Sequence, residues 1–212
     1  MGPGRIAEAG GNPMRVTKLV LGMLAIGVWV GPSNLYAQSQ AIDVNKSSLK
    51  IRVFKSGVFS AFAHDHEIQV PIEEGRIDEG KIDSSAQARV QLRMDARKMR
   101  VLDPEIAADK RAEIQHTMQG AAVLDVEKFP EISYQSTAVT GKGGAHWEVH
   151  GILSLHGEKQ PVVVEVFLQG GHYRGCASFK QSEFGITPIR IARGTIKVKD
   201  EVKIEFDIVP VP

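Results

Sequence analysis

The residues best suited to chemistry are two histidines, His64 and His66, which are separated only by Asp65. On a β-strand, residues two apart point to the same face, with their Cα atoms about 6.6 Å apart. Two imidazoles placed in this way can bind one divalent metal ion if a third ligand reaches them. Candidate third ligands are spread along the chain: Glu67, His116, His150 and His156. The alternative is that both rings lie at the rim of the fold and bond to loops or water.

No enzyme motif accompanies these histidines. The sequence lacks G-x-S-x-G, GxxxxGK[ST], a helix-opening GxGxxG and HExxH. Adjacent carboxylates such as Glu73-Glu74 fall in expected turns, where solvation explains them. The lone cysteine, Cys176, is expected to be an inert, small apolar side chain. We therefore predict a protein that is not an enzyme and requires no cofactor.

Composition narrows the classes of protein further. The 212 residues are 42% hydrophobic and 24% charged, which is ordinary for a globular protein. Lys and Arg number 26 against 25 Asp and Glu, so no basic field is available to hold nucleic acid. A single cysteine excludes an intrachain disulfide framework and an all-cysteine zinc site.

Residues 1–37 are predicted to be an N-terminal extension and a secretory signal peptide. Arg15 and Lys18 precede an apolar run, Leu19–Val30, and a small residue, Ala37, offers a cleavage point. The run is shorter than the roughly 20 residues that span a bilayer. The alternative is an uncleaved anchor or a buried helix. We expect export to a bacterial periplasm, with no stable membrane insertion after cleavage.

The remaining domain, residues 38–212, shows the two-residue alternation of half-buried strands. Expected strands run through Leu49–Val53, Ala63–Ile72, Ala88–Met94, Ile132–Gln135, Trp147–Leu155, Gln160–Leu168, His172–Phe184 and Val202–Ile208. One helix is expected over Asp103–Met118, with Asp103 as its N-cap and Pro104 at its first position. These patterns predict an all-β domain of about eight strands with one short helix inserted.

Eight antiparallel strands form either a sandwich or a closed barrel, and periodicity does not distinguish the two. An eight-stranded barrel is just wide enough for one small ligand, although its own side chains commonly fill it. Burial contributes about 0.8 kcal/mol per CH₂ group, so about ten to twenty carbons offset an association cost of about 4–15 kcal/mol. The residues alone leave open a solid interaction module and a hollow barrel that holds an apolar ligand.

Four segments share a fixed order and spacing: an opening strand at Asp43–Val53, an aromatic-Pro segment at Val126–Thr137, a His-Gly hairpin at Val149–Val166 and an acidic-Phe-Gly-Ile segment at Ser182–Ile186. Together they resemble the YceI-like family of bacterial periplasmic polyisoprenoid-binding proteins, over roughly residues 42–209. Three features depart from the family's pattern, one of which is His64-Asp65-His66, where many members have a less polar stretch. Gln181 stands where an arginine is usual, and the opening tryptophan is missing.

The resemblance implies a single lipocalin-like antiparallel β-barrel whose interior holds a long isoprenoid chain. It also implies transport, storage or sequestration of an apolar lipid or an isoprenoid quinone-like molecule. With the expected strand facing, it predicts a ligand-binding wall of Leu49, Ile51, Val53, Ile68, Val70, Val90, Leu92, Leu153, Leu155, Phe179, Ile204 and Phe206. The rival hypothesis is a periplasmic metal-binding protein that uses His64 and His66 in a redox or stress pathway.

Overall fold

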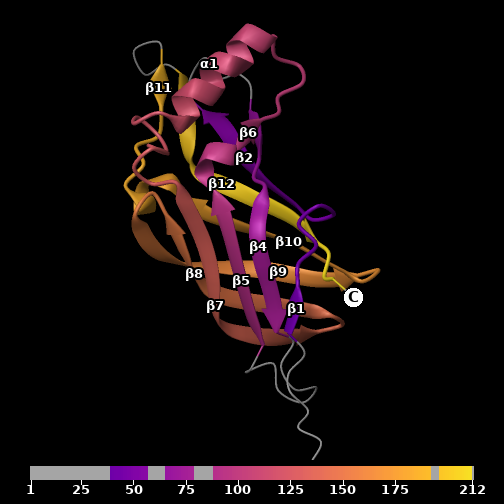
Figure 1. Cartoon of the computed structure of the whole chain (residues 1–212). Helices are drawn as coiled ribbons and strands as arrows, with labels where there is room; N and C mark the ends of the chain where they lie inside the picture. The colour runs from indigo at the N-terminus through magenta and orange to yellow at the C-terminus, as the bar shows by residue number, and fades with distance from the viewer. Residues whose placement is uncertain (1–38, 57–64, 79–87, 192–195, 212) are drawn as a thin grey trace, which may run out of the picture. The chain divides into compact units, whose positions relative to one another are not determined.

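The computed structural model describes residues 39–56, 65–78, 88–191 and 196–211, which all belong to one compact unit, Leu35–Pro212. This unit is all-β with one α-helix, and its strands form a single antiparallel sheet curled into a half-barrel (Figure 1). The predicted all-β class and the inserted helix are confirmed, whereas the sheet forms a half-barrel and not the predicted eight-stranded barrel. The predicted signal peptide lies outside the described residues. Within the described ranges, no helix has the length and apolar character needed to cross a membrane.

The described ranges contain twelve strands, and eleven of them follow the order β1-β4-β5-β7-β8-β9-β10-β12-β2-β3-β6, while β11 pairs with β12. The strands are β1 (Ser39–Ala41), β2 (Ser48–Ser56), β3 (His66–Gln69), β4 (Ile72–Asp78), β5 (Arg89–Asp95), β6 (Arg100–Val101), β7 (Glu131–Gly143), β8 (His146–Leu155), β9 (Glu158–Gln169), β10 (His172–Lys180), β11 (Arg190–Ile191) and β12 (Ile196–Ile208). The helices are η3 (Ala96–Lys98), α1 (Ala108–Gln119) and η4 (Gln181–Phe184).

The structure has more strands than the predicted eight because four of them, β1, β4, β6 and β11, were not predicted. The stretch expected to be one strand, Ala63–Ile72, holds β3 and the start of β4. Pro71 lies between them and has no N–H to donate to a strand ladder. β1 and β2 are separated by a turn in which the Asp43 carboxylate accepts the N–H of Asn45 at 3.1 Å. Glu73 and Glu74, which were expected in a turn, lie on β4.

The strands near the N-terminus, β1 to β4, have defined partners in the sheet. β2 pairs with β12 on one side and with β3 on the other, and β1 pairs with β4. Just after β1, Ile42 forms a bridge with Pro210, and the N–H of Asp43 donates to the Val209 carbonyl at 2.8 Å. β1 and β2 therefore lie between β12 and the β3–β4 stretch, which draws the two sides of the curled sheet together.

Alternation along the strands places the apolar side chains inside, as predicted. On β8, Val149, Leu153 and Leu155 are buried, whereas His150 and Ile152 between them are exposed. The sheet thus has one apolar inner face and one polar outer face, the usual arrangement for antiparallel strands.

The sheet has a capped end and an open end. α1 lies at the capped end, and β1 lies toward the other (Figure 1). At the capped end, η4 supplies Phe184, which is 0% exposed. Its ring meets Phe179 edge-on, with centroids 5.0 Å apart. The Nδ1 atom of His156 lies 3.0 Å from the Phe184 carbonyl oxygen and fixes the β8–β9 turn against η4.

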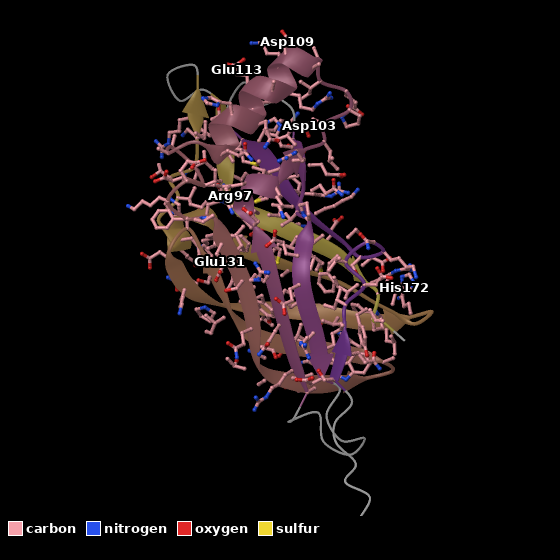
Figure 2. The ribbon with its side chains drawn as sticks, in the orientation of Figure 1. Arg97, Asp103, Asp109, Glu113, Glu131 and His172 are labelled. Atoms are coloured by element: carbon pink, nitrogen blue, oxygen red, sulfur yellow. The ribbon has the colours of Figure 1, made fainter. Side chains whose placement is uncertain are left out.

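The helix begins later than the sequence predicted. α1 starts at Ala108, its N-cap is Ala107, and no side chain caps it. Asp103 does not cap a helix because its carboxylate is used elsewhere. One oxygen lies 2.6 Å from the Nδ1 atom of His66, and the other accepts the N–H of Glu67 at 2.8 Å. Asp103 therefore connects β3 to the segment that leads into α1. Figure 2 shows Asp103 beside α1.

α1 contributes little apolar surface, since Met118 is its one fully buried residue. The helix instead contacts the last strand of the sheet order through Gln115. Its Nε2 group donates to the Met99 carbonyl at 2.9 Å, and its Oε1 atom accepts the N–H of Val101 at 2.8 Å. The side-chain amide thus takes the place of a further strand beside β6.

Candidate ligand cavity

A cavity of about 370 Å³ lies inside the curled sheet. Its volume falls within the range of about 300–1,000 Å³ that is common for small-molecule sites. Eight strands contribute lining residues: β2, β4, β5, β7, β8, β9, β10 and β12. The inner face is therefore hollow toward the open end, whereas large side chains fill it at the capped end.

The cavity wall is almost entirely apolar. Among the described residues, Asp78 is the one charged residue that lines it. The Tyr134 hydroxyl donates to the Val149 carbonyl at 3.1 Å. Burial raises the pKa of the Tyr134 phenol far above its ordinary value, so the group stays neutral. Trp147 and Tyr173 meet edge-on in the wall with ring centroids 6.4 Å apart.

Glycines in the middle of strands make room for the large residues of the wall. A Cβ atom at Gly151 would lie 2.4 Å from Cζ of Tyr134, and a Cβ atom at Gly175 would lie 2.7 Å from Cζ of Phe206. Both rings thus rest directly against the backbone of a neighbouring strand. Because the rings lie low on the sheet, the space above them stays open.

Half of the predicted wall residues line the cavity and half do not. Those that line it are Leu49, Val90, Leu92, Leu153, Ile204 and Phe206. The other six belong to the apolar core or pack against it without lining the cavity: Ile51, Val53, Ile68, Val70, Leu155 and Phe179. The sequence predicted that these side chains face inward. Whether such a side chain borders the cavity depends also on where the short helices fill the interior, and strand alternation does not give their positions. A ligand-binding role for any of them remains a prediction.

Several lining residues were missed, most of all on β9. Val162, Val164 and Val166 line the cavity, yet they stand in an apolar run with Val163, whose side chain is 44% exposed. Such a run conceals which residues face inward. Tyr134, in contrast, lies on a predicted strand whose alternation already gave its inward face, so the sequence held the signal that identifies it.

Of the two predicted metal ligands, His64 and His66, the structure describes only His66. His64 lies outside the described residues. The ring of His66 is held by Asp103 and is partly exposed, with a side-chain exposure of 23%. Over the ranges that the structure describes, no three His, Cys, Asp or Glu side chains gather as a metal site. The metal site therefore stays a prediction.

The four candidate third ligands do not converge on His66. Glu67 pairs with Lys50 at 2.7 Å, and His150 pairs with Glu148 at 2.7 Å on the outer face of β8. His156 lies in the β8–β9 turn, and His116 is exposed on α1. Cys176 is likewise exposed, on β10. These side chains are distributed over separate elements.

The fold and the cavity define an all-β protein whose single curled antiparallel sheet encloses an apolar hollow. The chain matches the YceI-like domain over residues 41–209 and belongs to the YceI-like family. The resemblance found in the sequence is thus confirmed.

Known relatives agree with this assignment. The crystal structure of BcnA from Burkholderia cenocepacia has a TM-score of 0.61 at 20% identity, and the match covers 79% of this chain and 98% of BcnA. It shows a shared fold. A UPF0312 protein of Pseudomonas savastanoi pv. phaseolicola is 37% identical over 73 residues, 30% of this chain and 38% of that protein. A UPF0312 protein of Yersinia pestis is 33% identical over 106 residues, 47% of this chain and 48% of that protein. The chain thus spans less than half the length of these two relatives.

Proposed function

We propose that the protein holds a long apolar chain of the isoprenoid type in its cavity and thereby transports, stores or sequesters it. The observation that carries this proposal is a hollow of about 370 Å³ whose described lining has a single charged residue, Asp78. Such a wall offers contacts to hydrocarbon and gives water few hydrogen bonds. Membership of the YceI-like family supports a small apolar ligand.

The energetics of burial are sufficient without any hydrogen bond to the ligand. Each CH₂ group removed from water contributes about 0.8 kcal/mol. On the order of ten to twenty buried carbons therefore offset an association cost of about 4–15 kcal/mol. A hydrocarbon tail of that length, or an isoprenoid quinone-like molecule, meets this requirement.

The remaining features of the proposal follow from the sequence. The eight strands that line the cavity together act as a lipocalin-like barrel around the ligand. The protein works without a catalytic residue and without a cofactor. Residues 1–37 direct it to the periplasm, where it handles lipid away from the cytoplasm.

The test measures binding of dispersed geranylgeraniol to the full chain. A Trp29→Phe substitution leaves Trp147, which lines the cavity, as the one tryptophan. We expect saturable quenching or a shift of Trp147 emission, and native mass spectrometry should show a complex of one protein with one lipid. A protein that shows neither effect would refute the proposal.

Two neighbours on β8 supply a matched pair of variants. Leu153→Arg puts an unpaired charge into the cavity wall and should lower the affinity by at least about tenfold. Ile152→Arg changes the adjacent residue, whose side chain is 36% exposed, and should bind as the parent does. If Leu153→Arg fails to fold, Val164→Phe tests the same wall, because it fills the cavity without adding charge. Equal affinity in all of these variants would place the lipid elsewhere.

A further inference from the structure

Two hairpin tips lie side by side at the open end of the sheet. The tip between β7 and β8 contacts the tip between β9 and β10, where the N–H of Leu168 donates to the Ala145 carbonyl at 3.0 Å. We call residues 143–147 and 166–173 the hairpin rim. These thirteen residues include no Asp, Glu, Lys or Arg. The two titratable side chains of the rim, His146 and His172, are paired with Glu165 and Asp207 on the strands beside it.

The hairpin rim exposes large apolar side chains. Phe167 is 38% exposed, and its ring stacks on His146 with centroids 4.2 Å apart. Leu168 is 37% exposed and also lines the cavity. The apolar surface of the cavity thus continues outward through Leu168 to the exterior of the protein. Trp147 and Tyr173 stand in the same stretch, and such aromatic residues favour the boundary between water and hydrocarbon.

The outer surface next to the rim is different, because ion pairs cover it. Arg174 pairs with Asp207 at 2.8 Å, and Lys142 pairs with Glu148 at 2.9 Å. At the tips themselves, a Cβ atom at Gly144 or Gly170 would meet nothing within 4 Å. The described tips of the rim thus have open space around them and can meet a flat surface.

We propose that the hairpin rim docks reversibly on the surface of a phospholipid bilayer, so that an apolar chain enters the cavity without crossing water. The purpose of docking rests on the proposed function, whereas the contact itself depends on the rim alone. A bilayer is the partner that fits because the exposed apolar surface of the rim joins the apolar lining of the cavity at Leu168. The headgroup region and the acyl chains beneath it can contact this surface and supply an apolar chain to the cavity.

The test places an environment-sensitive fluorophore on the rim of the full chain. Cys176→Ser removes the one native thiol, and Gln169→Cys places the label at the exposed β9–β10 tip. Lys159→Cys labels the other end of the same strand and is the control. On addition of phosphatidylethanolamine–phosphatidylglycerol vesicles, the emission should shift to the blue at position 169 and not at position 159. No shift at 169, or an equal shift at both positions, would overturn the proposal.

A second pair of variants tests the apolar contact. In vesicle flotation, Phe167→Glu should lower the bound fraction of the labelled protein by about fivefold, because it removes a partly exposed ring from the rim. Val163→Glu alters an exposed apolar residue on the same strand away from the tip, and it should leave the bound fraction unchanged. Equal losses in both variants would contradict docking through the rim.

The outcomes separate docking from ligand binding. Dispersed geranylgeraniol that binds to a protein without any vesicle-induced shift would overturn docking and leave the proposed function intact. A shift at position 169 in a protein that binds no geranylgeraniol would support docking and refute the proposed function.

Discussion

The capped end and the open end of the sheet use the same strands in opposite ways. At the capped end, Phe184 from η4 is fully buried against Phe179. At the open end, Phe206 and Tyr134 rest on glycines of neighbouring strands and leave a cavity of about 370 Å³. In Figure 2, Asp103 lies beside α1 at the capped end, and His172 lies farther toward the other end. The comparison shows that one end of the sheet is closely packed, whereas the other end encloses the cavity.

The physical reason is that a cavity costs stability, so another region must supply it. Close packing of large side chains gives each atom partners on all sides. A wall residue beside an empty cavity lacks partners on one side and contributes less. The capped end should therefore account for most of the stability, while the open end can change shape at low cost.

The largest expected effect comes from shortening the most buried ring. Phe184→Ala should lower the free energy of unfolding by about 3–5 kcal/mol, because it leaves a void in a packed region. Phe206→Ala removes the same side chain from the cavity wall, where it is only partly buried, and should cost about 1–2 kcal/mol. Urea denaturation measures both. Equal losses would break the comparison between the two ends.

The next effect concerns the shape of the cavity. In Gly151→Ala, the added Cβ atom would lie 2.4 Å from the Tyr134 ring and 2.7 Å from the Gln135 carbonyl oxygen. Overpacking of this kind costs about 1–3 kcal/mol, and it should push Tyr134 into the cavity and weaken geranylgeraniol binding. Gly141→Ala is the control, because its Cβ atom would meet nothing within 4 Å. Unchanged binding in Gly151→Ala would show that the ring does not limit the cavity.

The smallest expected effect is the contribution of one ion pair, between Asp95 and Arg97, to the free energy of unfolding. Hydrogen bonds from the Arg97 guanidinium lower the pKa of Asp95, at the start of η3, to about 2. A carboxyl whose pKa is depressed by folding stabilises the protein above its ordinary pKa and loses this contribution as the pH falls toward 2. The contribution should be about 1 kcal/mol, because the Arg97 side chain is 57% exposed to solvent.

The measurement compares urea denaturation near pH 5 and near pH 2.5 in the parent and in Asp95→Asn. The parent should lose more stability than the variant over this interval, since the variant has no carboxyl at position 95 to protonate. Asp109→Asn alters an exposed carboxylate on α1 and serves as the control (Figure 2). An equal pH dependence in the parent and in Asp95→Asn would refute the assignment.

Much of the fold could be predicted, because alternation reports which side of a strand faces inward. It gave the inner face of β8 correctly, including Leu153 in the cavity wall. It failed where the signal is ambiguous or where a distant partner decides. The apolar run on β9 does not show which of its residues face inward. Asp103 resembles a helix cap, but its carboxylate bonds to the His66 ring and to the N–H of Glu67 on β3. The extent of the hollow depends on how η4 and Phe184 close one end, which no local pattern records.

The amide of Gln115 has a consequence for the behaviour of the protein in concentrated solution. Exposed strand edges can recruit the edge of another molecule and initiate aggregation. β6 ends the order of the sheet, and the hydrogen bonds to Met99 and Val101 are already taken by this one side chain. An otherwise poorly packed helix thereby protects the β6 edge from pairing with a strand of another molecule.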